Sequence, residues 1–308
     1  MRLLITGASG VVGRALVAKA ALDPQIDIVA LSGRDDGDLE QSQEARAIVR
    51  FVKPNAIVHL AAAVHGLGGN LKFPADVYRR NILVNTHVID ACREFNVNKV
   101  VAMGTTAIYS DKVTIPFSET DCLLGEPHSS EYAYATAKRA MLVQLRSYGE
   151  QYGLKYAYAI ATNMYGPYDR FDEENGHVVP SLISKFQFAQ TSCDDVTIWG
   201  DGSPTRDFLY SDDAAEGLLL MLKLGEGTFN LATGISRSIK DLVEVLKRHY
   251  PGVEVKWDVN KPRGQLERSY SIERLTSLGY SPQYTFEDGI AKTIEWYRKN
   301  FFPANLHT

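Results

Sequence analysis

The chain has 308 residues, of which 45% are hydrophobic and 23% are charged, and its formal net charge is −4. This balance provides for one large core or two interlocked domains, and it excludes a strongly basic surface of the kind that binds nucleic acid or membranes. The three cysteines, Cys92, Cys122 and Cys193, are far apart and form no CxxC pair, which argues against a metal site or a disulfide framework.

The chain begins with MRLLITGASG, in which no charged leader precedes an apolar core and a cleavage site. No run approaches the roughly 18 consecutive apolar residues that a membrane span needs. We therefore expect a cytoplasmic protein that neither crosses a membrane nor binds nucleic acid.

Short apolar runs alternate with helix-length segments through the first half of the chain. The pattern predicts strands at 3–6, 26–31, 56–63 and 99–104, and a first helix at 11–21. Strands rich in Val, Ile and Ala, separated by helices of about 10–15 residues, indicate a parallel sheet covered on both faces. The sequence thus predicts an α/β fold with a Rossmann-like, doubly wound parallel sheet.

The rhythm changes after residue 165, where prolines and glycine turns interrupt shorter elements. The segment 208–232 again has the pattern of a helix followed by a strand, and residues 236–308 read as mixed helix and turn. We expect a dinucleotide-binding domain at 1–165, to which 205–235 returns. A smaller substrate-binding region is expected at 166–204 and 236–308.

A glycine turn with the spacing G-x-x-G-x-x-G follows the first predicted strand at Gly7, Gly10 and Gly13. The first two glycines are one residue further apart than in the dinucleotide fingerprint, but the physical role is the same. Glycine permits the tight turn and lets a pyrophosphate approach the amides at the start of a helix. The turn therefore predicts a bound dinucleotide.

The end of the second predicted strand indicates which dinucleotide. An NAD enzyme places an Asp or Glu about twenty residues after the turn, where it binds the ribose 2′-hydroxyl. Here the strand ends in Ser32-Gly33-Arg34, with no acid before Asp35. Ser32 and Arg34 suit a 2′-phosphate, so we expect NADP(H); the alternative is that Arg34 is an ordinary solvated loop residue.

Tyr134 and Lys138 are four residues apart, on one face of a predicted helix. A free tyrosine titrates near pH 10, and an ammonium group one turn away is expected to favour the phenolate for proton transfer. Tyr132, with Thr136 at the equivalent spacing, is discounted. Thr105, at the end of a predicted strand, supplies a hydroxyl beside a substrate carbonyl, or else merely caps the backbone there.

Further segments carry a resemblance to a known family. TGASGVVG (6–13), HLAAA (59–63), GTTAIY (104–109), YATAK (134–138) and TNMYGP (162–167) resemble the extended short-chain dehydrogenases/reductases. PADVYRRN (74–81), NGHVVPSL (175–182), WGDGSPTRDFLYSDD (199–213) and KPRG (261–264) resemble the GDP-L-fucose synthase branch. Members of that branch epimerise a GDP-4-keto-6-deoxymannose at carbons 3 and 5 and then reduce carbon 4 with NADPH. The resemblance also implies a homodimer formed through two helices of each subunit.

The resemblance implies a role for individual residues of this chain. The catalytic residues are Thr105, Tyr134, Lys138 and His177. The cofactor-binding residues are Gly7, Ser9, Gly10, Val11, Val12, Gly13, Ser32, Arg34, Leu60, Ala61, Ala62 and Ala63, together with Tyr134 and Lys138. The substrate-binding residues are Thr106, Ala107, Asn163, His177, Lys185, Trp199, Arg206 and Arg268.

Some of these assignments have ordinary structural alternatives. Lys185 stands where the family has an arginine, and the motif Arg-x-x-Asp that contains Arg268 ends here in Ser271. Lys185, Arg206 and Arg268 could all be surface cations, and His177 could be a structural loop residue. Their chemistry suits the diphosphate of a nucleotide, which needs local cations in a weakly acidic protein.

The chain departs from the branch at Ala107, which occupies the position of the epimerase cysteine. His177 matches the partner histidine, but a methyl group cannot carry a proton. Sugar-nucleotide 4,6-dehydratases have an Asp-Glu pair after the catalytic Thr, and this chain has Thr106-Ala107. The sequence therefore predicts an NADPH-dependent 4-keto reductase of a GDP-linked sugar, a 6-deoxyhexose or a heptose, with epimerase activity lost or reduced. A bifunctional GDP-L-fucose synthase and a non-catalytic NADP-binding sensor remain as alternatives.

Overall fold

The first apolar run of the chain forms a central strand of a parallel sheet in the computed structural model, which describes residues 1–64, 67–172, 176–260 and 266–301. Strand β1 (Arg2–Thr6) buries four consecutive residues, as a strand covered on both faces requires. All pairs in this six-stranded sheet are parallel. In spatial order its strands are β2 (Asp27–Leu31), β1, β3 (Ala56–His59), β4 (Lys99–Met103), β5 (Lys155–Ala161) and β9 (Gly227–Leu231).

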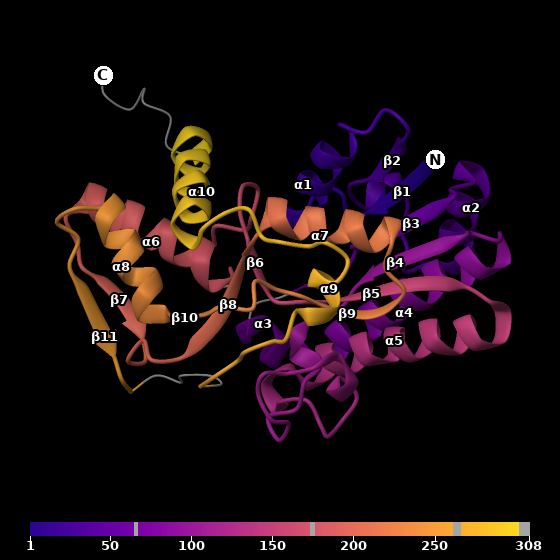
Figure 1. Cartoon of the computed structure of the whole chain (residues 1–308). Coiled ribbons are helices and arrows are strands. Elements are labelled where there is room, and N and C mark those ends of the chain that lie inside the picture. Colours follow the sequence, from indigo (N-terminus) through magenta and orange to yellow (C-terminus); the bar gives the residue numbers. More distant parts are fainter. Residues whose placement is uncertain (65–66, 173–175, 261–265, 302–308) are drawn as a thin grey trace.

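Helices cover both faces of this sheet, and Figure 1 shows α7 above it and α5 below it. One face carries α1 (Val11–Ala20) and α7 (Ser211–Lys223), and the other carries α2 (Ser42–Val52), α4 (Pro74–Glu94) and α5 (Tyr132–Tyr152). Each face has its own buried apolar cluster. The predicted doubly wound α/β fold is confirmed, and the strand order reverses between β1 and β3, where ligands bind in such sheets.

Local signals in the sequence set several of these helix boundaries. Pro74 occupies the first turn of α4, where its missing N–H costs nothing. Gly153 ends α5 in the left-handed region, at φ 71°, as glycine commonly does at a helix C-terminus.

A smaller body is built from the later part of the chain. It contains a three-stranded sheet of β10 (Ser236–Ser238), β8 (Thr205–Tyr210) and β6 (Asn163–Tyr165), and a two-stranded sheet of β11 (Val255–Asp258) and β7 (Val196–Trp199). Its helices are α6 (Val178–Ser192), α8 (Ile239–His249) and α10 (Phe286–Phe301). A third apolar cluster lies among these elements.

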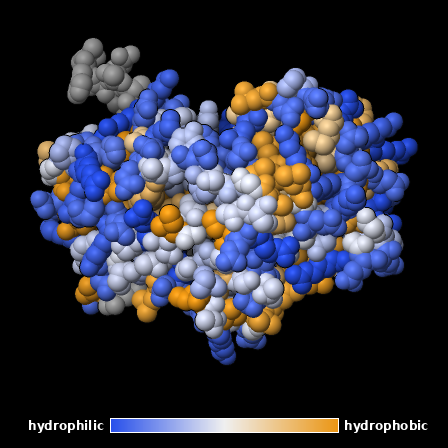
Figure 2. Space-filling view, in the orientation of Figure 1, coloured by the Kyte–Doolittle hydropathy of each residue, from blue (hydrophilic) through white to orange (hydrophobic). Residues whose placement is uncertain are grey.

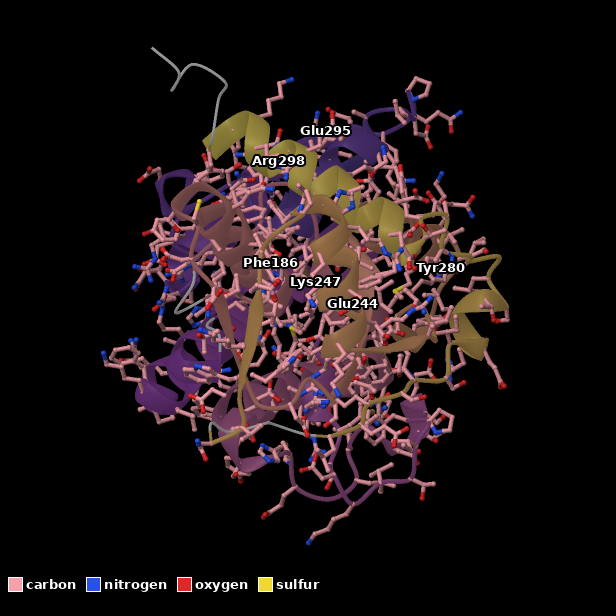
Figure 3. The ribbon with its side chains drawn as sticks, turned by 90° about the vertical axis from the view of Figure 1, so that its left-hand side faces the viewer. Phe186, Glu244, Lys247, Tyr280, Glu295 and Arg298 are labelled. Carbon is pink, nitrogen blue, oxygen red and sulfur yellow. The ribbon has the colours of Figure 1, made fainter. Side chains whose placement is uncertain are left out.

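Helix α10 holds this smaller body together through Arg298, which Figure 3 labels together with Phe186 of α6. The Arg298 guanidinium donates to the Gln187 side chain of α6 at 2.9 Å and to the His249 carbonyl of α8 at 2.9 Å. It also lies 4.6 Å from the centre of the Tyr250 ring. One residue near the C-terminus therefore ties α6 and α8 to α10.

Short helical elements complete the described chain. They are the 3-10 turns η1 (Arg34–Asp36), η2 (Thr106–Ile108), η3 (Glu119–Asp121) and η4 (Ser129–Glu131) and the helices α3 (Leu67–Lys72) and α9 (Glu273–Thr276).

The predicted elements agree with the structure in most of the first half. The strands predicted at 3–6, 26–31 and 99–104 are confirmed, and the helix and strand predicted within 208–232 are α7 and β9. The strand predicted at 56–63 is wrong beyond His59, because the N–H groups of Ala61 and Ala63 donate to side chains instead of to a neighbouring strand. The region 236–308 also contains two strands, β10 and β11, which are too short for their periodicity to stand out.

Three broader properties concern the described residues and the surface that they form. Within the described ranges, no helix combines the length and apolar character needed to cross a membrane. The same ranges contain no group of three or more His, Cys, Asp or Glu side chains that could hold a metal. On the face drawn in Figure 2, hydrophilic residues predominate and apolar residues occur in small groups.

Candidate active site

The glycine turn lies at the carboxyl end of β1 and has no room for a side chain at Gly7 or Gly13. Gly7 has φ 71°, and a Cβ there would lie 2.7 Å from the Ala61 nitrogen. A Cβ on Gly13 would lie 2.3 Å from the Gly7 carbonyl oxygen. The first amides of helix α1, from Val11 and Val12 onward, lack an intrahelical acceptor. Gly10, which precedes the helix, has no side chain that could cap them. This cradle fits a pyrophosphate.

The segment 60–63, predicted to line the cofactor, is fixed from two sides. Thr6 Oγ1 accepts a hydrogen bond from the Ala61 N–H at 3.3 Å. Asn81 is fully buried, accepts from the Ala63 N–H at 3.2 Å and donates to the Ala63 carbonyl at 2.9 Å. Leu60, Ala61, Ala62 and Ala63 all remain partly exposed beside the glycine turn.

His59 lies beneath this segment as a neutral, structural residue. Its Nδ1 is 2.8 Å from Thr6 Oγ1, and its Nε2 is 3.1 Å from Asn85 Oδ1. Because Oδ1 can only accept, Nε2 carries the proton and Nδ1 accepts from the Thr6 hydroxyl. Burial, together with the nearby Lys138, lowers the pKa of His59 to about 3.

Arg34 lies in a cluster of arginines around one carboxylate. Its guanidinium pairs with Glu40 and lies 3.8 Å from Asp38. Glu40 also pairs with Arg80 at 2.7 Å and with Arg79 at 3.7 Å. The sequence has no acid before Asp35, but the fold brings these later acids to Arg34. Three arginines thus gather near the end of β2 together with Glu40, Asp38 and the neighbouring Asp36, and arginine is the side chain best suited to bind a phosphate.

Ser32, the other residue expected near a 2′-phosphate, is bonded through its backbone. Its carbonyl accepts from the Ser9 hydroxyl, and its N–H donates to Asp36 Oδ2 at 2.6 Å. These bonds fix the loop after β2 against the glycine turn.

Tyr134 and Lys138 lie in the first two turns of α5, beside the end of β4. The Lys138 ammonium donates to the Met103 carbonyl at 2.8 Å and lies 5.9 Å from the centre of the Tyr134 ring. Lys138 is 1% exposed, and the Tyr158 hydroxyl donates to its carbonyl at 2.9 Å. The structure therefore brings the pair together and fixes the lysine from both ends.

The expected acidification of the tyrosine is wrong for the structure without ligands. Burial, together with the nearby Glu131 carboxylate, raises the pKa of Tyr134 above its usual value. Burial also lowers the pKa of Lys138 to about 7, so this lysine carries a full charge only at lower pH. Tyr134 thus holds its proton, which suits a proton donor.

Thr105 follows β4 and caps the short turn η2. Its Oγ1 accepts a hydrogen bond from the Ala107 N–H at 3.2 Å. Thr105 therefore caps the backbone, as one of the two sequence-based interpretations expected. This bond uses a lone pair of Oγ1, so the hydroxyl proton can still be donated to a carbonyl oxygen. Thr106 and Ala107 are both buried, at 4% and 1% exposure.

One buried side chain, Asn230 of β9, ties the loop that follows Thr105 to the main sheet. The backbone N–H of Asn230 donates to Glu119 Oε1 at 2.8 Å, and the side-chain Oδ1 accepts from the Tyr109 hydroxyl at 2.6 Å. Its Nδ2 donates to the carbonyls of Phe117 at 3.0 Å and Ser271 at 2.8 Å. We refer to this set of bonds as the Asn230 hub.

Two predicted substrate-binding arginines lie close to the start of α5. Arg268 is 7% exposed and pairs with Glu131 at 3.1 Å. Burial, together with Arg268, lowers the pKa of Arg206, so the two guanidinium groups are near each other. One carboxylate faces two cations there, an arrangement that suits a diphosphate.

The remaining predicted substrate residues are more dispersed. Asn163 donates to the Asp207 carbonyl at 3.4 Å. His177 precedes α6 with its side chain 51% exposed, and its Nδ1 lies 3.8 Å from Asp169, whose carboxylate raises the pKa of His177. Lys185 lies two turns further along α6, and Trp199 is 61% exposed at the end of β7. The KPRG segment lies outside the described residues.

The two buried cysteines of the chain lack the surroundings of an activated thiol. Cys92 and Cys122 are buried, and burial raises the pKa of each. Cys193 is exposed, at the end of α6. Since only a thiolate serves as a base, the two buried cysteines do not suit the role of the cysteine absent from position 107.

Several residues around the site escaped the sequence analysis. Arg79, Arg80 and Asn81 all belong to the PADVYRRN segment, which was noted only for its resemblance. Glu40 and Glu131 had no signal of their own, because their partners Arg80 and Arg268 lie far away in the sequence.

One protein family and several known proteins are similar to this chain over most of its length. Residues 3–232 match the family described as the NAD dependent epimerase/dehydratase family. A GDP-L-fucose synthase of Dictyostelium discoideum is 35% identical over 98% of this chain and 97% of its own length. The Escherichia coli protein named GDP-L-fucose synthase is 32% identical, over 97% of both chains. The crystal structure of a GDP-L-fucose synthetase from Naegleria fowleri bound to NADP is 31% identical, with a TM-score of 0.89 over 97% of this chain and 94% of that one.

Proposed function

The chain belongs to the NAD dependent epimerase/dehydratase family, and from that premise we propose that it reduces the 4-keto group of a GDP-linked sugar with NADPH. Its relatives over nearly the whole length are GDP-L-fucose synthases, and one similar structure contains NADP. The chain is accordingly an NADP(H)-dependent oxidoreductase of the extended short-chain type that acts on GDP-sugars. The restriction to reduction, with epimerase activity lost or reduced, is our proposal.

The observation that carries this proposal is the group of residues at the end of β4. Thr105, Tyr134 and Lys138 suit reduction of a carbonyl, whereas Ala107 offers no proton for epimerisation. Cys92 and Cys122, with raised pKa values, offer no thiolate either. The glycine cradle and the arginine cluster around Glu40 fit NADP(H).

In the proposed reaction, the residues of the chain position the ketone and supply one proton. NADPH, when bound, supplies the two electrons and the hydrogen that the carbonyl carbon gains. The Thr105 hydroxyl donates a hydrogen bond to the carbonyl oxygen and orients it. Tyr134 then transfers its proton to that oxygen as negative charge develops there. Lys138, charged below about pH 7, stabilises the tyrosinate that remains.

The two bodies of the molecule divide the binding of the ligands. We propose that residues 1–165 and the returning 205–235 segment bind NADP(H), and that 166–204 and 236–308 bind the GDP-sugar. The position of β9 beside β5 supports the return of the chain. Arg206 and Arg268 bind the diphosphate, with Asn163, His177, Lys185 and Trp199 contributing to the sugar and the base. Asn163 and Arg206 are the exceptions to this division, because their strands β6 and β8 pair in the three-stranded sheet of the smaller body. We further propose a homodimer.

The test is turnover of GDP-4-keto-6-deoxymannose with NADPH in heavy water, followed by mass analysis of the product. We expect reduction at carbon 4 without incorporation of solvent deuterium at carbons 3 and 5. Deuterium at both carbons would contradict the proposal and identify a bifunctional epimerase/reductase. NADPH binding without oxidation would instead indicate a non-catalytic sensor.

A further inference from the structure

The ion pair between Arg268 and Glu131 joins a guanidinium group, expected to bind the diphosphate, to the residue that precedes α5. Arg268 Nη2 lies 3.1 Å from Glu131 Oε2, and the Arg268 side chain is 9% exposed whereas the Glu131 side chain is 29% exposed. Little of the guanidinium is therefore open to a second anion while the pair is intact.

The backbone around Arg268 is bonded to two other parts of the chain. The Ser236 hydroxyl of β10 donates to the Arg268 carbonyl at 2.7 Å. One residue further on, the Ser269 carbonyl accepts from the Phe117 N–H at 2.8 Å. Strand β10 pairs with β8, which contains Arg206, so these bonds also keep Arg268 on the side of Arg206. Of the two partners in the ion pair, Glu131 is thus the one whose side chain has room to move.

Glu131 is also the acid that acts on both arginines. It occupies the N-cap of α5, but its side chain makes no capping bond to that helix. Burial and Arg268 lower the pKa of Arg206, and the Glu131 carboxylate partly offsets this decrease. Asp207, the residue after Arg206, has its carboxylate bonded to the N–H groups of Thr233 and Gly234. The charge of Glu131 therefore balances the arginine pair while the site is empty.

An empty site and an occupied site differ in their charge balance. Without a ligand, Glu131 reduces the cost of burying the guanidinium groups of Arg206 and Arg268 near each other. A diphosphate brings a negative charge on each phosphate and can balance both arginines by itself. Glu131 then becomes a surplus negative charge beside the ligand, and like charges in such a contact cost free energy.

Resting on the proposed function, we propose that Glu131 is an internal counter-ion of Arg268 that the diphosphate of the sugar nucleotide displaces. The carboxylate takes the place of a phosphate while the site is empty and returns to Arg268 when the product leaves. It weakens the binding of substrate and product alike, and this favours product release. Uniformly tighter binding would lower KM without raising kcat, so the weaker binding leaves the chemical step unchanged. Glu131 is thus a residue that sets the affinity for the nucleotide.

The experiment measures the dissociation constant of GDP by calorimetry in the presence of saturating NADP⁺. Glu131→Gln keeps the size of the side chain and removes its charge. We expect this variant to bind GDP about tenfold more tightly than the wild type, as expected when one hydrogen bond to a charged group no longer competes. The ligand-free variant should also melt at a lower temperature, because Arg268 loses its charged partner. A purely structural role would lower the melting temperature without tightening GDP binding.

Further variants isolate the cause. Glu126→Gln removes the same charge from an exposed residue of the preceding loop and should leave the GDP affinity unchanged. Arg268→Met should weaken GDP binding, and adding Glu131→Gln to that variant should no longer tighten it. If Glu131→Gln is unfolded without ligand, Glu131→Ala, which lets water reach Arg268, replaces it.

The outcomes separate this inference from the proposed function. Equal or weaker GDP binding in the Glu131 variant overturns the inference while the proposed function stands. The inference also fails if Glu126→Gln tightens binding as much, because the effect then comes from general charge. Tightening that persists without Arg268 overturns it as well, since another cation is then responsible. If GDP does not bind to the wild-type complex, the proposed function itself fails, and this inference fails with it.

Discussion

The residues around Lys138 and the residues expected to hold the sugar nucleotide differ in how firmly the fold positions them. Lys138 is buried, its ammonium is bonded to the Met103 carbonyl, and its own carbonyl accepts from Tyr158. His177 and Trp199, in contrast, are half or more exposed and lie on elements of the smaller body. The proposed chemical centre belongs to the main sheet, and most of the proposed substrate contacts come from the smaller body.

This difference indicates which properties of the enzyme can vary. A proton donor must be held at a fixed place, and backbone groups of β4 and α5 provide that place. Selectivity depends on groups such as Arg206 and Trp199, which different sugars would engage differently. Mutations in the first region should therefore abolish the reaction, and mutations in the second should change its substrate.

The largest effect is expected from Tyr134→Phe, which removes the proposed proton donor. We expect kcat for ketone reduction to fall by about a thousandfold, within the range of general acid catalysis. The melting temperature should change little, because the ring is retained. Tyr152→Phe, at the exposed end of the same helix, is the control. Intact turnover in the Tyr134 variant would show that the proposed mechanism is wrong.

The next effect concerns the charge on Lys138. Because the ammonium stabilises the tyrosinate and its pKa is about 7 in the ligand-free protein, kcat/KM should fall as pH rises above that value. The quantity kcat/KM reports the groups of the free enzyme. Lys138→Met should lower kcat by about a hundredfold and remove this dependence. A pH profile that is the same in both proteins would assign the titration to another group.

A smaller effect is expected at the arginine cluster around Glu40. Arg34→Ala should lower the preference for NADPH over NADH by about tenfold, as expected for one hydrogen bond to a charged group. The measurement is the ratio of kcat/KM values for the two cofactors, and Arg50→Ala on α2, outside this cluster, is the control. A clear preference of the wild type for NADH would contradict the assignment of NADP(H).

A last effect, comparable per pH unit with the previous one, should appear in stability rather than in rate. The pKa of His59 is about 3 in the folded protein and near 6.5 when unfolded. Below pH 6.5 the unfolded chain therefore binds a proton at His59 that the folded chain does not bind. The free energy of unfolding should fall by about 1.4 kcal/mol per pH unit from this group between pH 6.5 and 3. In urea unfolding, the free energy of unfolding of His59→Gln should fall less steeply than that of the wild type as the pH is lowered. Equal slopes for the two proteins would contradict this account.

The sequence predicts the main sheet and the proximity of Tyr134 and Lys138 well, because both depend on local patterns. Buried apolar runs mark β1, β2 and β4, and the glycine spacing marks the cradle. The spacing of Tyr134 and Lys138 places them on one helix face. The resemblance to extended short-chain dehydrogenases/reductases is confirmed for the family.

Contacts between distant segments escape the same analysis. Nothing near Arg34 in the sequence indicates that Arg80 shares its carboxylate. The state of the Tyr134 proton depends on burial, which spacing does not reveal. The polar strand β10 is recognisable only from its pairing with β8.

The Asn230 hub has a consequence for how the protein is made. Its bonds reach from Tyr109 to Ser271, so the loop beside Thr105 gains its last support only when residue 271 is available. A ribosome delivers a protein from its N-terminus, and the first part of the chain contains the glycine cradle and the pair Tyr134 and Lys138. A nascent chain that stops before β9 would thus carry every reactive group and still lack the clamp that holds them in a working arrangement.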